Sequence, residues 1–221
     1  MKDFIWGPSP YPRFKEIIEK EIFIDNIYTK FFNVEEGDVV FDIGASVGPF
    51  TYSILKNNPS HVFAFEPSFE MFKTLVLNTR QGPVTQINKG ISSLEGEFEF
   101  EFAFNDDDGA KMYSTTFNRI IQDYNINKID FLKTDCEGGE YDIFTPNNLI
   151  WIKQNVKKIV GEWHLRLPEH KKKFREFRDL YLRIFPNYEI MDVLGHPIKQ
   201  DIWNEQFIEY YKEITIYINN S

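Results

Sequence analysis

The sequence predicts an α/β domain built on a mostly parallel sheet flanked by helices. Short apolar runs alternate with segments whose apolar residues recur at helical spacing, which is the pattern of βαβ units. The runs at 39–43 and 61–65 are nearly continuous, as expected of strands buried on both faces. The chain shows no internal repeat, low-complexity segment or dividing linker, so we expect a single domain over residues 1–221.

The individual elements follow from local patterns. Three prolines in residues 6–12 predict an extended arm, and helical spacing predicts one or two helices over 13–32. Strict alternation of Phe and Glu over 97–104 predicts a half-buried strand. The other expected helices cover 49–55, 68–80, 115–124, 140–144 and 168–185, and the other expected strands cover 39–43, 61–65, 84–91, 129–134, 158–163, 188–193 and 207–218.

Composition and charge argue against several classes of protein. No stretch approaches the ~18 uncharged apolar residues of a membrane span. Cys136 is the only cysteine, so neither an internal disulfide nor a cysteine-based zinc site is expected. The first residues lack the apolar run of a signal peptide, and we expect a cytoplasmic protein. The formal net charge of −9 disfavours nonspecific binding to nucleic acid without excluding it.

The ends of the first strands carry a pattern typical of nucleoside binding. Ligands of open α/β sheets bind beyond the carboxyl ends of the strands. The strand at 39–43 is followed by a turn whose two glycines allow the backbone to approach a ligand closely. The strand at 61–65 is followed by an acidic residue, which can accept hydrogen bonds from both ribose hydroxyls. The candidate cofactor-binding residues are Asp42, Gly44, Ala45, Ser46, Gly48, Glu66 and Pro67, with Ser92 after the next strand.

The type of nucleoside cofactor can be narrowed. A dinucleotide fingerprint has a glycine two residues before Gly44, whereas this chain has Asp42, whose carboxylate would repel a pyrophosphate. The same carboxylate suits a cationic ligand with an amino group, such as S-adenosylmethionine. An NAD-linked oxidoreductase is therefore a distant alternative, and a turn whose glycines serve packing alone is another.

Two further strand ends carry charged side chains. Asp135 and Glu137 follow the strand at 129–134, and such charges are costly unless they are paired or functional. The alternative is that they cap the next helix or pair with Lys133. His164 follows the strand at 158–163, where a histidine suits a general base near neutral pH, although a surface histidine would give the same pattern.

Three segments together resemble one family. Residues 39–51 (VVFDIGASVGPFT), 63–67 (FAFEP) and 129–140 (IDFLKTDCEGGE) are similar to the FkbM-type methyltransferases. The most specific part is the Lys-x-Asp-x-Glu-Gly-x-Glu element in the third segment. The chain departs from the family at Ser46, where the loop often reads Gly-Ala-Asn, and at Cys136, where an apolar residue is usual.

The resemblance implies a fold, a reaction and a cofactor. It extends over roughly residues 20–165 and implies a Rossmann-like class I methyltransferase fold, with a central seven-stranded sheet whose last strand is antiparallel. It implies S-adenosylmethionine-dependent O-methylation of a hydroxyl on a sugar, a glycan or a natural product. On this basis residues 1–35 are an arm with helices, 36–165 the cofactor-binding core, and 166–221 the acceptor side.

This chemistry assigns roles to the strand ends. The proton of a sugar hydroxyl must leave as the new bond forms, so a base is expected within hydrogen-bond reach. His164 is the first candidate and Asp135 the second, and Asp135 is also expected at the cofactor. The candidate acceptor-binding residues are Glu137, Glu162 and Trp163. In a metal-assisted variant, Asp135, Glu162 and His164 would bind Mg²⁺ or Mn²⁺, although no spacing demands it.

Two rival functions belong to other classes. A methyltransferase acting on RNA or protein would keep the cofactor and take a macromolecular acceptor. A noncatalytic S-adenosylmethionine-binding module would keep the fold and lose the chemistry, and the intact Asp42, Gly44, Gly48, Glu66 and Asp135 count against such a loss. The sequence does not indicate the oligomeric state.

Overall fold

A single seven-stranded sheet organises the chain. The computed structural model describes residues 4–7, 12–98, 112–185 and 187–220. The strands lie in the order β3-β2-β1-β7-β8-β10-β9. Their bounds are β1 (Val39–Ile43), β2 (His61–Phe65), β3 (Val84–Ile87), β7 (Ile129–Thr134), β8 (Val156–His164), β9 (Tyr188–Met191) and β10 (Glu213–Asn219). The first five named pair in parallel, whereas β10 runs antiparallel to both β8 and β9. The predicted sheet is therefore confirmed.

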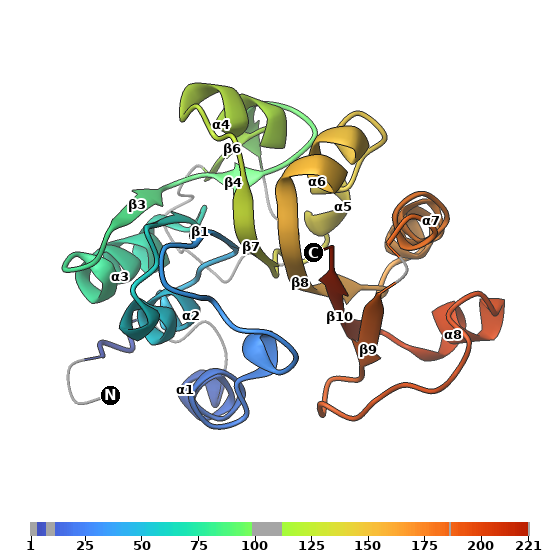
Figure 1. The fold of residues 1–221 in the computed structure, drawn as a ribbon. Coiled ribbons are helices and arrows are strands. Elements are labelled where there is room, and N and C mark those ends of the chain that lie inside the picture. Colours follow the sequence, from blue (N-terminus) through green and yellow to red (C-terminus); the bar gives the residue numbers. More distant parts are fainter. Residues whose placement is uncertain (1–3, 8–11, 99–111, 186, 221) are drawn as a thin grey trace.

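Helices cover both faces of the sheet (Figure 1). Along β1, Phe41 packs on one side with Phe117, whereas Val40 packs on the other with Phe50 and Tyr28. Among the described residues, no helix has the length and apolar character needed to cross a membrane. The first face carries α4 (Phe117–Asp123), α5 (Glu140–Ile143), α6 (Leu149–Asn155), α7 (Pro168–Phe177) and α8 (Glu205–Tyr210), and the second carries α1 (Phe14–Ile18), α2 (Pro49–Ile54) and α3 (Phe69–Thr79).

The N-terminal segment, residues 14–29, packs onto the second face as three short pieces. After α1 come a π-helical stretch (Glu19–Ile24) and a 3₁₀ turn (Ile27–Thr29), so the helices predicted over 13–32 are present but broken. Tyr28 is 4% exposed and belongs to the same cluster of buried residues as Phe131 of β7. The segment is thus part of the core, and it carries Tyr28 to the ends of the central strands.

A second, three-stranded sheet was not predicted. It consists of β4 (Gly90–Ile91), β6 (Met112–Thr115) and β5 (Gly96–Phe98). The single strand expected over 84–91 is divided because the side-chain amide of Asn88 donates to the carbonyl oxygens of Glu66 (2.8 Å) and Pro67 (3.0 Å). β5 covers only the start of the strand predicted over 97–104, whose residues 99–104 lie outside the described ranges.

The prediction of one strand over 207–218 is wrong in its first part. Residues 207–210 belong to α8, whose start is capped by the Asn204 side chain accepting a hydrogen bond from the Gln206 amide at 2.9 Å. β10 begins only at Glu213. α6 was also missed, and the helix expected over 168–185 consists of α7 and a π-helical turn (Arg178–Leu182). A further 3₁₀ turn (Leu55–Asn57) extends α2.

Candidate active site

Three backbone amides of the loop after β1 donate hydrogen bonds to residues at the end of β2. The amides of Gly44 and Ala45 both donate to the Phe65 carbonyl, at 3.0 and 2.8 Å, and the Ser46 amide donates to Glu66 Oε2 at 2.8 Å. Left-handed backbone at Gly44 (φ 76°) and Ser46 (φ 52°) turns these amides toward β2. A pyrophosphate site needs amides directed at the ligand, and these three are already used. The geometry therefore disfavours a dinucleotide, as Asp42 does in the sequence.

Gly44 lies where the ends of β1 and β7 touch. A Cβ atom at this position would lie 1.7 Å from the backbone oxygen of Asp135. The Asp135 amide also donates to the Ile43 carbonyl at 3.0 Å. Only a residue without a side chain allows this contact, which brings the loop after β1 and the charged end of β7 into one site.

Glu66 is held by two backbone amides. Ser46 donates to Oε2 at 2.8 Å and Ser68 donates to Oε1 at 2.7 Å. Burial raises the pKa of Glu66 to about 7, against the opposing effect of these hydrogen bonds. Because a carboxylate offers about four lone-pair sites, two remain to accept from ribose hydroxyls. Pro67 directly follows and is half-buried.

Asp42 lies in β1 just before this loop and is 0% exposed. The Thr51 hydroxyl donates to Asp42 Oδ2 at 2.7 Å, and Lys133 Nζ lies 3.1 Å from Oδ1. Lys133 also donates to the Gly44 carbonyl at 2.7 Å. The register of β1 and β7 sets Asp42 opposite Lys133, so the charge of Asp42 is matched by a protein cation. Lys133 thus pairs with Asp42, not with Asp135 or Glu137 as in the alternative interpretation of the sequence. A contact of Asp42 with a ligand's amino group stays a prediction.

Asp135 and Glu162 meet at the ends of β7 and β8, joined by Tyr28. The Tyr28 hydroxyl lies 2.9 Å from Asp135 Oδ2 and 3.0 Å from Glu162 Oε1. Lys133 Nζ lies 5.1 Å from the centre of the Tyr28 ring. Sequence reasoning missed Tyr28, because no local pattern indicates a contact between residues 107 positions apart. Lys133, a charged residue among the buried residues of β7, is the one signal that points to this region.

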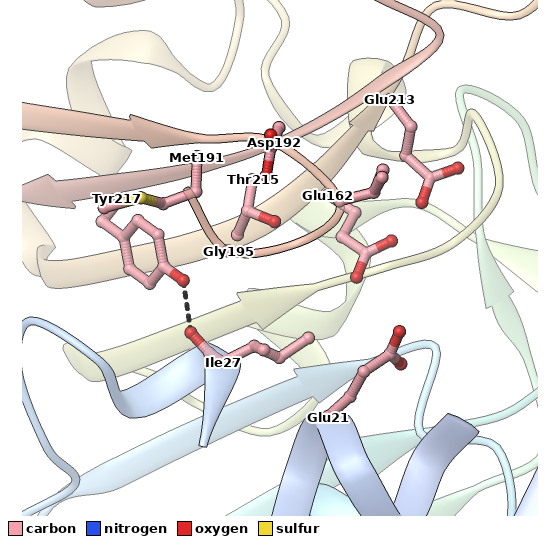
Figure 2. A pocket seen from close by; sticks show the side chains of 10 residues that line it. Glu21, Ile27, Glu162, Met191, Asp192, Gly195, Glu213, Thr215 and Tyr217 are labelled. Carbon is pink, nitrogen blue, oxygen red and sulfur yellow. Dashed lines mark hydrogen bonds between the residues drawn. The ribbon is translucent and has the colours of Figure 1, made fainter. Parts of the chain in front are cut away.

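A small hollow adjoins these groups between the N-terminal segment, β8 and β10. Figure 2 shows the carboxyl groups of Glu21, Glu162 and Glu213 turned toward one another there. Burial and the negative charge of Asp135 raise the pKa of Glu21 to about 7 and that of Glu162 well above its usual range. The remaining lining residues are Ile27, Met191, Asp192, Val193, Gly195, Thr215 and Tyr217.

His164 is buried against Glu140, and the two side chains are 1% and 0% exposed. His164 Nδ1 lies 3.2 Å from Glu140 Oε1, which also accepts from the His164 amide at 2.8 Å, and Nε2 lies 3.4 Å from Glu137 Oε2. Burial by itself lowers the pKa of His164, but the charge and hydrogen bond of Glu140 outweigh it and raise the pKa to about 10. At neutral pH the ring is protonated, whereas a base must be neutral. A protonated ring cannot accept the acceptor's proton, which counts against His164 as the base; the identity of the base stays a prediction.

The raised pKa of His164 predicts a pH-dependent stability. Folding raises this pKa from 6.5 to about 10, so the pair stabilises the folded state fully below pH 6.5. The contribution is lost as pH rises toward 10, and we expect the free energy of unfolding to fall by a few kcal/mol over that range. Urea unfolding at several pH values checks this. His164→Gln should show a much smaller decline, and equal declines in both proteins would contradict the assignment.

The three residues considered for a metal lie close together. One ligand atom each of Asp135, Glu162 and His164 falls within 4.8 Å of the others. The Tyr28 hydroxyl lies between the two carboxyl groups, and Glu140 contacts the Nδ1 side of the His164 ring. Carboxylate oxygens and an imidazole nitrogen are ligands of the kind that bind Mg²⁺ or Mn²⁺, so the metal-assisted variant stays a prediction.

The remaining predicted residues lie in different surroundings. Trp163 is fully buried, and its ring packs 4.8 Å from that of Phe177, measured between ring centres. Neighbouring side chains of β8 point to opposite faces, so Trp163 faces the core and the expectation that it contacts the acceptor is corrected. Glu137 accepts from Arg166 at 2.8 Å at the rim. Ser92 follows β4, not β3, and its hydroxyl donates to the Leu94 carbonyl at 2.6 Å.

The strand order, with antiparallel β10 inserted next to β8, defines the Rossmann-like fold of class I methyltransferases. The sequence model of the methyltransferase FkbM domain matches residues 42–187. The chain therefore belongs to the FkbM methyltransferase family. Residues of the site that lie outside the matched region include Glu21, Tyr28 and Glu213.

Individual proteins are also similar to this chain. The hexuronic acid methyltransferase AglP of Haloferax volcanii is 28% identical over 141 residues, which cover 59% of this chain and 57% of that protein. A structure named "putative rRNA-methylase" from Clostridium thermocellum has a TM-score of 0.51 at 14% identity, covering 88% of this chain and 93% of that one. An S-adenosylmethionine-dependent O-methyltransferase of Thermotoga maritima has a TM-score of 0.49 at 12% identity, covering 92% and 71%. The structure from Clostridium thermocellum therefore shares the fold of this chain.

Proposed function

We propose that this chain transfers the methyl group of S-adenosylmethionine to a hydroxyl of a sugar or glycan. The observation that carries the proposal is the contact of Gly44 with the Asp135 backbone, which places two halves of a site side by side. One half is the loop after β1 with Glu66, whose free lone pairs suit a ribose. The other is the carboxyl pair Asp135 and Glu162, which suits a cation and a hydroxyl.

The protein's own residues have three tasks in this reaction. When bound, the cofactor supplies an activated methyl group on a sulfonium centre. Glu66 and the loop after β1 position it, and the carboxylate of Asp135 attracts positive charge. Asp135 then accepts the proton of the acceptor hydroxyl as that oxygen forms its bond to carbon. His164, protonated and held by Glu140, fixes the end of β8 beside the acceptor.

The charge of the acceptor side supports a hydroxyl-rich acceptor. Glu137, Glu162 and Glu213 line up along the ends of β7, β8 and β10, and carboxyl groups exchange hydrogen bonds with sugar hydroxyls. The same groups, with the net charge of −9, disfavour an RNA acceptor. They also favour a neutral sugar over an anionic one.

Ligand-dependent thermal unfolding tests the cofactor. At 100 times its dissociation constant a ligand adds ~2.7 kcal/mol to the free energy of unfolding, which raises the melting temperature by roughly 5–11 °C for a chain of this size. We expect this shift with S-adenosylmethionine and S-adenosylhomocysteine and none with NAD. Transfer of labelled methyl from the cofactor to a panel of glycans then tests the acceptor. A shift with NAD alone, or with none of the three, would contradict the proposal.

A further inference from the structure

One side-chain amide joins three parts of the chain next to the loop after β1. Asn78 lies near the end of α3. Its Oδ1 accepts from the Ile5 amide at 2.8 Å, and its Nδ2 donates to the Ile5 carbonyl at 2.8 Å and to the Val47 carbonyl at 2.7 Å. Asn78 thus uses its acceptor and both of its donors. It fastens residues 4–7, which we call the leading segment, to the loop after β1.

The Val47 carbonyl belongs to a tight, buried turn. Val47 is 0% exposed, and beside it the Gly48 amide donates to the Ala45 carbonyl at 2.8 Å. A buried carbonyl without a hydrogen bond costs free energy. Asn78 supplies that hydrogen bond from α3, so the conformation of the turn depends on where this side chain is held.

Apolar contacts connect the leading segment to the same turn. Phe4 is 7% exposed and belongs to one cluster of buried residues with Val47 and Met71. Its ring meets that of Tyr52 of α2 edge-on, with 5.1 Å between the ring centres. Met71 Sδ in turn accepts from the Ser46 hydroxyl at 3.7 Å. The leading segment therefore packs against the loop and against a residue that is bonded to the loop.

We propose that Asn78 is a positioning residue for the cofactor. By fastening the leading segment to the loop after β1, it holds this loop in the conformation that binds Glu66 and leaves the carboxylate's remaining lone pairs to the ribose. The effect on the cofactor rests on the proposed function, whereas the fastening does not. The leading segment lies before residue 42, where the match to the family model begins, so residues outside the matched region support cofactor binding inside it.

Reciprocity gives this proposal a second consequence. If attachment of the leading segment strengthens cofactor binding by some factor, bound cofactor must strengthen that attachment by the same factor. The backbone amide of Ile5 reports the attachment directly, because its hydrogen bond goes to Asn78. Hydrogen exchange at this amide should therefore slow when the cofactor binds.

Asn78→Asp is the substitution that tests the fastening. The carboxylate keeps the size of the side chain and still accepts from the Ile5 amide, but it loses both donors and sets negative charge beside the carbonyls of Ile5 and Val47. Phe4→Ala is a second variant that weakens the leading segment and leaves α3 and the sheet intact. It provides the same measurements if Asn78→Asp does not fold.

Asn220→Asp is the matched control. The Asn220 side-chain amide also donates to two carbonyl oxygens, those of Lys153 at 2.8 Å and Val156 at 2.7 Å. These bonds lie at the start of β8, at the opposite end of the strand from the candidate site. The control therefore loses two comparable hydrogen bonds without touching the loop after β1.

Binding of S-adenosylhomocysteine, measured by calorimetry, and hydrogen exchange at residue 5 are the two readouts. In Asn78→Asp and Phe4→Ala we expect the Kd to rise on the order of 10-fold, with a matching rise in KM for the cofactor and kcat unchanged at saturating cofactor. Exchange should slow on ligand binding in the parent and in Asn220→Asp, and should be fast with and without ligand in Asn78→Asp.

An unchanged Kd in Asn78→Asp, or an equal rise in Asn220→Asp, would overturn the proposal, because a general loss of stability would affect both variants alike. If the parent does not bind S-adenosylhomocysteine, the proposed function fails. Exchange without ligand then decides the fastening alone: faster exchange at residue 5 in Asn78→Asp than in Asn220→Asp supports it, and equal exchange removes it.

Discussion

Replacing Asp135 with Asn is expected to lower the turnover of methyl transfer by ~10²–10⁴-fold. Asn matches the size and shape of Asp, so the contact with Gly44, made by the backbone, is kept. What is lost is the negative charge that accepts a proton at the end of β7. Single-turnover rates with saturating cofactor and acceptor measure this step directly.

Asp142→Asn is the control for this substitution. Asp142 follows the same motif, but its carboxylate accepts from the Ser93 amide and pairs with Lys173, away from Tyr28 and Glu162. The Asp142→Asn variant should therefore transfer methyl groups at the rate of the parent. If Asp135 acted only by binding the cofactor, more S-adenosylmethionine would restore the Asn variant. Such a rescue, or turnover within tenfold of the parent, would remove Asp135 from the role of base.

Gly44→Ala is expected to cost about 3–5 kcal/mol of stability and to abolish binding of S-adenosylhomocysteine. Two costs combine at this residue. Its φ of 76° is left-handed, which costs a residue with a side chain roughly 1–2 kcal/mol. The added methyl group would also lie 1.7 Å from the Asp135 backbone oxygen, so the ends of β1 and β7 must separate. Urea unfolding and the ligand-induced thermal shift measure the two losses.

Gly37→Ala separates these costs. Gly37 has a φ of 83°, and no atom lies within 4 Å of the position its Cβ would take. The Gly37→Ala variant should lose only the stability that the left-handed backbone costs, and it should bind S-adenosylhomocysteine as the parent does. If the two variants were equally stable, the contact of β1 with β7 would not be the constraint that requires glycine at position 44.

The parts of the fold that the sequence predicts well are those with local causes. The strands at 39–43, 61–65 and 129–134 match β1, β2 and β7 because burial on both faces demands an apolar run. The failures come from partners remote in sequence or from short capping signals. Asn88 divides a strand by binding carbonyls at the end of β2, and the cap at Asn204 makes a helix of residues that alternate poorly as a strand.

In the candidate site, too, the sequence predicts local features better than contacts between remote residues. The sequence predicted that Glu66 and the loop after β1 lie together, and the hydrogen bond from the Ser46 amide to Glu66 joins them; their role at a cofactor stays a prediction. The buried partners of Asp42 and His164, Lys133 and Glu140, could not be predicted because only the packed sheet brings them together. No local pattern pointed to Tyr28 itself.

The interior position of β10 has a consequence for the order in which this protein is made. β8 pairs with β7 on one edge and with β10 on the other, yet β10 follows β8 by some fifty residues of chain and comes after β9. While a ribosome extends the chain, the outer edge of β8 therefore stays unpaired until residues 213–219 have emerged, and unpaired strand edges recruit other chains. The matched family region ends at residue 187, before both β9 and β10. A nascent chain that ends at residue 187 contains all the matched motifs, but the outer edge of its β8 is still unpaired.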